Sequence, residues 1–107
     1  MKRGDVVTIA LSGAYGKPRP ALIVQSHLFS AHSSVTILPI TSAIRAAPLL
    51  RIAIEPSPAN GLRATSQIMI DKAQTVPCEK IGKRIGTADS DVMLTVNRSL
   101  AIFLGIA

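Results

Sequence analysis

The sequence predicts a mainly β protein: a small β-barrel followed by a C-terminal α-helix. Short runs rich in Val, Ile, Leu and Thr recur between positions 5 and 85, and turn signals interrupt them about every 8–12 residues, as in small barrels and sandwiches. After Thr87 the apolar residues adopt helical spacing instead. A chain of 107 residues suits one domain, so we expect residues 1–107 to form a single unit.

Six segments have the composition of β-strands, because β-branched and apolar residues dominate them. Proline has no N–H to donate, so Pro20 fits the start of a strand or an edge, and Pro39 predicts an edge or a bulge. The predicted strands are residues 5–11, 19–25, 34–40, 49–54, 65–71 with 73–76 as its continuation, and 81–85.

Glycine, proline and small polar residues mark the connections. Residues 12–18 contain two glycines and a proline and predict a loop, and residues 56–61 (PSPANG) form the clearest turn signal. Residues 27–33 have a weak pattern that allows one helical turn. Residues 41–48 predict a loop or a loose helical turn.

Residues 88–104 predict the helix, since they contain no proline or glycine. Thr87 can cap the first turn, where the carboxylates of Asp89 and Asp91 favour the helix dipole, and Gly105 provides the stop. The apolar residues, spaced three and four apart, are Val92, Val96, Leu100, Phe103 and Leu104.

The charge points to a polyanionic partner. Twelve Lys and Arg against six Asp and Glu give a net charge of +6 and a pI near 10.3. The aromatic residues are only Tyr15, Phe29 and Phe103, which favours contact with phosphates over base stacking. A general bias toward arginine in the source genome is the alternative explanation.

Several classes of protein are excluded or disfavoured. No apolar run reaches the roughly 18–20 residues of a membrane span, and Gly4 and Asp5 interrupt the stretch where a signal peptide would need its apolar core. Cys78 stands alone, so we expect no internal disulfide, no cysteine metal cluster and a reducing, cytoplasmic setting. Phosphate-loop, dinucleotide and metal motifs are missing, and we expect no cofactor.

Arg19 is the leading candidate for a functional side chain. Pro18 and Pro20 restrict its backbone to extended conformations at the start of a strand. Its planar guanidinium suits two phosphate oxygens. An ordinary surface arginine is the alternative.

Hydroxyl and carboxyl groups near strand ends are the next candidates. Thr41 and Ser42 follow an apolar strand and can donate to a phosphate or start a turn, and Asp71 can orient Arg19 or accept a proton. His27 and His32 are further acid–base candidates, although neither has a carboxylate neighbour in the sequence.

A basic segment runs from position 80 to position 84. Lys80, Lys83 and Arg84 can contact phosphates, or they can occupy a solvated hairpin corner between Gly82 and Gly86. Cys78 fits a half-buried structural role better than that of a nucleophile, because only Lys80 near it in the sequence could stabilise a thiolate.

An ordered set of short motifs resembles the MazF/PemK (Kid) family of toxin endoribonucleases from bacterial toxin–antitoxin pairs. No single motif is specific, but together they span nearly the whole chain. They are residues 3–7 (RGDVV), 17–24 (KPRPALIV), 39–42 (PITS), 60–62 (NGL), 70–72 (IDK), 74–76 (QTV), 82–86 (GKRIG) and the terminal helix.

The resemblance implies an SH3-like barrel of the CcdB/MazF type that forms a two-fold dimer and binds single-stranded RNA on the shared face. It implies metal-independent, sequence-selective cleavage, in which the ribose 2′-OH attacks and a 2′,3′-cyclic phosphate remains. Arg19 and Thr41 correspond to the key arginine and threonine, and Ser42 and Asp71 to supporting residues. The partner would be an antitoxin with an acidic, largely disordered tail, and Lys17, Lys80, Lys83 and Arg84 would contact RNA.

Two departures from the family pattern stand out. Met69 occupies the position that we match to an important arginine of the PemK/Kid branch, and residues 12–17 form a short loop without an acidic residue. Two alternatives follow: a nucleic-acid-binding barrel without catalysis, and a gyrase poison similar to CcdB. The second is disfavoured because residues 104–107 (LGIA) contain no tryptophan.

Overall fold

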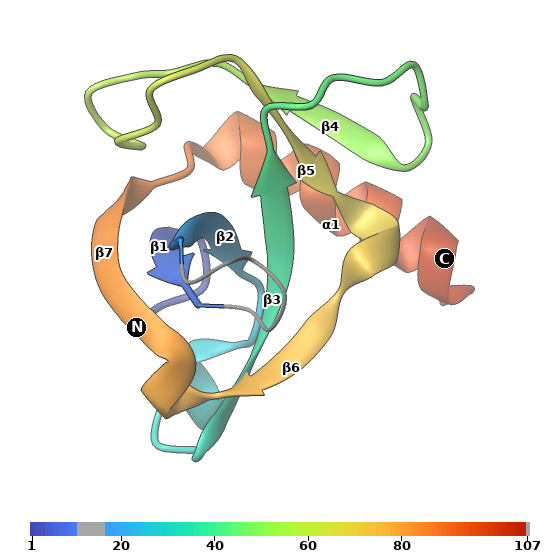
Figure 1. The fold of residues 1–107 in the computed structure, drawn as a ribbon. Coiled ribbons are helices and arrows are strands. Elements are labelled where there is room, and N and C mark those ends of the chain that lie inside the picture. The colour runs from blue at the N-terminus through green and yellow to red at the C-terminus, as the bar shows by residue number, and fades with distance from the viewer. Residues whose placement is uncertain (11–16, 107) are drawn as a thin grey trace.

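Seven β-strands form one antiparallel sheet that curls into a barrel, and an α-helix follows them (Figure 1). The architecture comes from a computed structural model that describes residues 1–10 and 17–106. The strands are β1 (Asp5–Ile9), β2 (Arg19–Ile23), β3 (Ser34–Thr41), β4 (Arg51–Ile54), β5 (Ser66–Met69), β6 (Gln74–Pro77) and β7 (Ile81–Thr87), and the helix is α1 (Ser90–Leu104). Three short 3-10 helices join them: η1 (His27–Phe29), η2 (Ile70–Lys72) and η3 (Cys78–Lys80). The predicted fold class is confirmed. The predicted loop at residues 12–18 lies largely outside the described residues.

The sheet has the strand order β4-β5-β3-β2-β1-β7, and β6 pairs with the other half of β3. The first half of β3 pairs with β6 as far as Ile37, and its last two residues, Ile40 and Thr41, pair with β5. Pro39 lies between these two ladders. β3 is therefore an interior strand, and the predicted edge position is wrong; proline occurs where the partner strand changes.

The central strands are buried on both faces, so their sequences lack a polar face. Alternate residues of a strand point to opposite sides of the sheet, and the two sides carry separate cores. One core fills the barrel: Val7, Ile9, Ala21, Ile23, Val35, Ile37 and Val76. The other lies between the sheet and α1: Val6, Leu22, Val24, Leu38, Ile40, Ile52, Ile54, Ile68, Ile70 and Val96. Figure 1 shows α1 running behind β3 and β5 on this second side.

The strand predicted to run from position 65 to position 76 is two strands. β5 ends at Met69, and the 3-10 helix η2 turns the chain before β6 begins at Gln74. Ile70 holds this turn, since its side chain is fully buried and its N–H donates to the carbonyl of Leu50 at 2.9 Å. Polar and apolar residues continue to alternate through the turn, so the sequence pattern does not reveal it.

The predicted helix is confirmed, with a different N-terminus. Asp89 is the N-cap: its carboxylate accepts the N–H of Val92 at 2.8 Å. Thr87, the predicted cap, is instead the last residue of β7 and pairs with Asp5. Gly105 ends the helix in a left-handed conformation with φ 74°, as predicted.

Candidate functional site

A cleft of about 500 Å³ opens where β2 and β3 approach the connection between β4 and β5. Its wall combines cationic, hydroxyl and apolar groups. Among the described residues it is lined by Thr8, Pro18, Arg19, Pro20, Ile40, Thr41, Ser42, Gly61, Leu62, Arg63, Ala64, Ser66, Lys83 and Ile85.

The pairing of β2 with β3 brings Arg19 to Thr41. The β2–β3 ladder ends at the pair of Ala21 with Pro39, two residues before Arg19 on β2 and two residues before the end of β3 at Thr41, and both residues line the cleft. The strand ends therefore bring the two leading candidates to the same cleft, with the Arg19 side chain exposed to solvent.

The hydroxyl of Thr41 is already oriented by its own chain. Its Oγ1 accepts the N–H of Ala43 at 3.0 Å. An oxygen that accepts this bond keeps its O–H to donate elsewhere. Ser42, the next residue, is exposed and lines the same cleft. The pair can thus present hydroxyl donors to an anion held by Arg19.

The connection at positions 55–65 forms the outer wall and is organised by buried Asn60. The Asn60 side chain accepts the N–H groups of Ser57 and Leu62 at 3.0 and 2.9 Å, and donates to the carbonyl of Glu55 at 2.7 Å. These bonds fold the connection back on itself and direct Leu62, Arg63 and Ala64 toward the cleft.

Close contact with β7 holds the same connection in place. The N–H of Thr87 donates to the carbonyl of Ala59 at 2.8 Å. A Cβ on Gly86 would lie 2.3 Å from that carbonyl oxygen, and a Cβ on Gly61 would lie 2.1 Å from the carbonyl oxygen of Ile85. Only glycine permits this approach, and no local pattern indicates which strand the turn contacts.

Sequence reasoning missed Arg63, Ser66 and Thr8 as lining residues. Arg63 is the most important of them, because it adds a second exposed guanidinium to the wall. Its only sequence signal is its place two residues after the Asn60–Gly61 turn. Ser66 is buried, and its hydroxyl donates to the carbonyl of Ala64 at 2.8 Å, which fixes the base of the wall.

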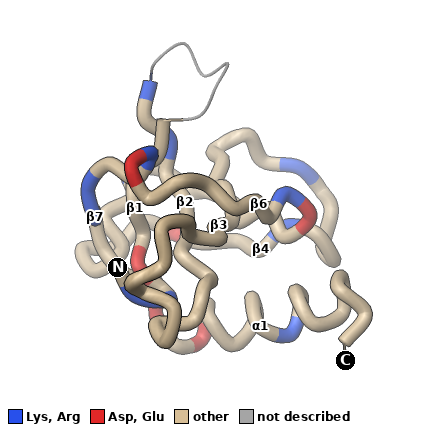
Figure 2. Tube along the Cα trace, turned by 90° about the horizontal axis from the view of Figure 1, so that it is seen from below, with Lys and Arg blue, Asp and Glu red and all other residues tan. Residues whose placement is uncertain are grey.

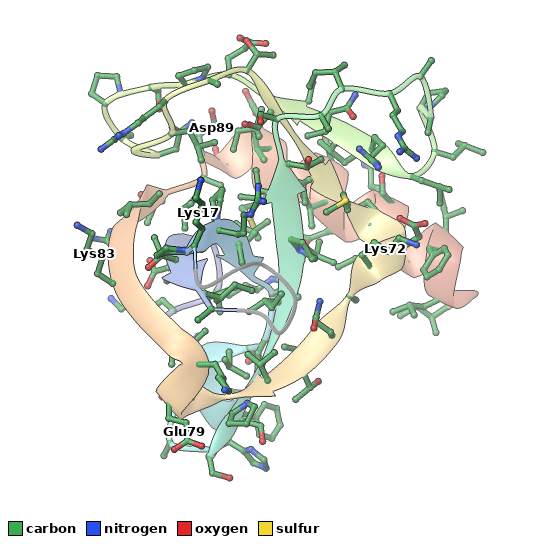
Figure 3. The ribbon with its side chains drawn as sticks, in the orientation of Figure 1. Lys17, Lys72, Glu79, Lys83 and Asp89 are labelled. Atoms are coloured by element: carbon green, nitrogen blue, oxygen red, sulfur yellow. The ribbon has the colours of Figure 1, made fainter. Side chains whose placement is uncertain are left out.

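The predicted basic residues are spread over different places. Lys83 lines the rim of the cleft and projects outward from β7, whereas Lys17 is drawn in front of β2, between β7 and β3 (Figure 3). Arg84 donates from Nε to the buried carboxylate of Asp5 at 3.1 Å, and Lys80 lies on η3, outside the cleft lining. The hairpin-corner interpretation is wrong, because positions 82–86 belong to β7.

Asp71 does not line the cleft. It lies on η2, where its carboxylate is 3.6 Å from the ammonium of Lys72. Figure 3 shows Lys72 on the other side of β3 from β7. The predicted histidines are also elsewhere: both His27 and His32 are exposed, and Nδ1 of His32 accepts the N–H of Ser34 at 3.1 Å. The half-buried Cys78 donates its S–H to the carbonyl of His32 at 3.3 Å.

The described lining of the cleft therefore carries arginine and lysine without any carboxylate, imidazole or thiol. The whole sequence has twelve Lys and Arg against six Asp and Glu, and Figure 2 marks both kinds along the chain. Within residues 1–10 and 17–106, no group of three or more His, Cys, Asp or Glu is placed to hold a metal ion. No helix among these residues is both long enough and apolar enough to cross a membrane.

Fold and cleft together define a small basic β-barrel with an open site suited to an anionic strand. A family model described as PemK-like, MazF-like toxin of type II toxin-antitoxin system matches residues 2–104. The chain belongs to this family of toxins.

Individual relatives agree with this assignment. The chain is 51% identical over 108 residues to a probable endoribonuclease MazF of Mycolicibacterium smegmatis, with 100% of this chain and 99% of that protein covered. The match covers the full length of both proteins, so the family assignment holds for the whole chain.

Solved structures share the fold. An endoribonuclease in complex with its cognate antitoxin, from a mycobacterial species, superposes with a TM-score of 0.84 at 26% identity, covering 100% of this chain and 97% of that chain. A MazE–MazF complex from Deinococcus radiodurans gives a TM-score of 0.81 at 19% identity, with the same coverage.

Proposed function

We propose that this chain is the toxin of a toxin–antitoxin pair and cleaves single-stranded RNA, with sequence selectivity and without a metal ion, at the Arg19–Thr41 pair. In the proposed reaction the ribose 2′-hydroxyl gives its proton to solvent and its oxygen bonds to the adjacent phosphorus, while the bond from phosphorus to the 5′-oxygen breaks and that oxygen takes a proton from solvent. The products are a 2′,3′-cyclic phosphate and a 5′-hydroxyl end. The observation that supports this proposal is the meeting of a guanidinium and an oriented hydroxyl in an open, cationic cleft.

Each side chain has a defined role in this reaction. Negative charge develops on the phosphate oxygens as phosphorus becomes five-coordinate, and donors already in place stabilise it. Arg19 supplies a charged two-point donor, and Thr41 supplies the O–H that its bond from Ala43 leaves available. Arg19 is assigned to charge stabilisation and not to proton transfer, because arginine stays protonated at all ordinary pH values. Thr41 is assigned to charge stabilisation as a hydrogen-bond donor.

The remaining basic residues contribute to binding. Arg63 and Lys83 line the cleft and Lys17 lies beside it, so successive phosphates of a strand can be neutralised along the wall. Ser42 adds a hydroxyl next to Thr41. Lys80 and Arg84 are given weaker roles, since neither lines the cleft and Arg84 is paired with Asp5. Asp71 receives no catalytic role in this proposal.

Protein partners are part of the proposal. The solved relative was obtained with its cognate antitoxin, and the net charge of +6 favours an acidic, disordered tail of such a partner. A homodimer is supported by an apolar surface at the end of α1, where Ile102, Leu104 and Ile106 are 64%, 59% and 78% exposed. A cytoplasmic location follows from the proposed substrate.

One observation favours a second candidate, a barrel that binds RNA without cutting it. The described lining of the cleft offers no carboxylate or imidazole to accept the 2′-hydroxyl proton. The two candidates differ in products and agree in binding, so one experiment separates them.

The test is cleavage of a long RNA in EDTA, with mapping of the cut ends. We expect cyclic phosphate and 5′-hydroxyl ends, and we expect Arg19→Ala and Thr41→Ala each to reduce the rate by about 10²-fold or more. Arg98→Ala is the matched control, since Arg98 is an exposed arginine on α1 outside the cleft. Binding without cleavage favours the second candidate, and unchanged cleavage by both cleft variants contradicts the assigned site. Arrested growth with intact RNA and damaged gyrase would indicate a CcdB-like poison.

A further inference from the structure

We propose that Gln67 is a positioning residue for RNA cleavage, which holds the segment after Thr41 so that the Thr41 hydroxyl stays aimed at the substrate. This inference rests on the proposed function and adds a residue to it. Gln67 lies on β5 directly opposite Thr41, the last residue of β3.

The Gln67 side chain binds the backbone of Arg45 as a neighbouring strand would. Its Oε1 accepts the N–H of Arg45 at 3.1 Å, and its Nε2 donates to the carbonyl of Arg45 at 2.9 Å. Positions 42–46 form no regular secondary structure and are exposed, so side chains and solvent are the partners open to their polar backbone groups. One glutamine satisfies both groups of Arg45.

Arg51 strengthens this arrangement and depends on it. The Nη1 of Arg51 donates to Oε1 of Gln67 and to the carbonyl of Ala43, each at 3.2 Å. The carbonyl of Ala43 is thereby held by Arg51, while its N–H donates to Oγ1 of Thr41 at 3.0 Å. Loss of Gln67 releases Arg45 directly and removes one of the two anchors of Arg51.

The consequence for chemistry passes through Thr41. The hydroxyl proton of Thr41 is directed outward only while Ala43 donates to its oxygen, and Ala43 is fixed by the bonds around Gln67. A misplacement of about 1 Å at a catalytic group can lower a rate about 10²-fold. Gln67 contacts the backbone behind the site, so its loss should affect the chemical step more than substrate binding.

Gln67→Met tests the idea, because methionine keeps the volume and removes both amide groups. Gln25→Met is a matched control: Gln25 is also half-buried and binds the backbone of Phe29, Ser34 and Thr36 at 3.1–3.2 Å, in a loop outside the cleft. With a fluorogenic RNA we expect Gln67→Met to lower kcat about 10–100-fold with KM changed less than about 3-fold. We expect Gln25→Met to lower thermal stability comparably and to leave kcat within about 2-fold.

Two further variants show whether Gln67 acts through Thr41. Combined with Thr41→Val, the Gln67→Met change should cost less than about 3-fold in kcat, since the group it positions is already gone. Gln67→Glu keeps both acceptor bonds but loses the donor to Arg45, and should restore part of the rate. Equal losses in both backgrounds, or equal kcat effects of Gln67→Met and Gln25→Met, would overturn the inference.

Amide hydrogen exchange separates this inference from the proposed function. We expect the amides of Ala43 and Arg45 to exchange at least about 10-fold faster in Gln67→Met than in the native chain and in Gln25→Met. If the native chain cuts no RNA, the proposed function and the positioning role of Gln67 both fail, regardless of the exchange rates. If the native chain cuts RNA and the exchange rates are unchanged, only the role of Gln67 fails.

Discussion

Replacement of the buried Asn60 by alanine should lower the free energy of unfolding substantially. The side chain is 5% exposed and makes three hydrogen bonds, to the N–H groups of Ser57 and Leu62 and to the carbonyl of Glu55. Each bond contributes about 1 kcal/mol, so we expect the free energy of unfolding to fall by about 3 kcal/mol. For a domain of this size that corresponds to a drop in Tm of about 10–20 °C.

Urea unfolding followed by circular dichroism measures this change, and Asn60→Asp serves as its partner variant. Aspartate keeps both accepted bonds but sets a buried carboxylate oxygen against the carbonyl oxygen of Glu55, so we expect this variant to be destabilised as well. In the cleavage assay, Asn60→Ala should raise KM at temperatures where it remains folded, because Arg63 and Leu62 lose their fixed place on the wall. A loss below about 1 kcal/mol would refute the view that Asn60 organises the connection.

Three further predictions concern separate parts of the molecule. Arg63→Ala should weaken binding of an RNA oligonucleotide and reduce the slope of log K against log salt by about 1, measured by fluorescence anisotropy between 50 and about 200 mM salt. Asp71→Asn should leave the cleavage rate within about 2-fold of the native value, since its carboxylate pairs with Lys72 outside the cleft; a loss of 10²-fold or so would return Asp71 to the reaction. Val96→Ala should lower the free energy of unfolding by about 2 kcal/mol in urea, because Val96 is the fully buried contact of α1 with the sheet.

The strands and the helix could be predicted because their signals are local. Apolar, β-branched runs indicated β1 to β4, and the spacing of Val92, Val96 and Leu100 indicated α1. Local patterns do not, however, assign residues to a core. β1, β2 and β3 are apolar on both faces. Their sequences therefore do not indicate that Val6 faces the helix or that Val7 faces the interior of the barrel.

The errors have a common physical origin in contacts between distant segments. Thr87 has the chemistry of a helix cap, but its pairing with Asp5 keeps it in β7 and passes the cap to Asp89. Asp71 follows an alternating run, but burial of Ile70 ends the strand and turns the chain away from the cleft. Arg63 was missed for the same reason, since the docking of its connection on β7 is decided by the fit of Gly61 and Gly86.

The structure shows why the positive charge of the cleft is not neutralised by acidic residues of the chain. Among the described residues there are two ion pairs, Lys72 with Asp71 and Arg84 with Asp5, and neither lies in the cleft lining. The guanidinium groups of Arg19 and Arg63 therefore face the cleft with no carboxylate in its described wall to neutralise them. An anionic strand is the natural counterion for such a surface, and releasing its condensed cations drives binding in a salt-dependent way. If the proposed function holds, an acidic antitoxin tail that neutralises the same charge would exclude the RNA substrate from the cleft.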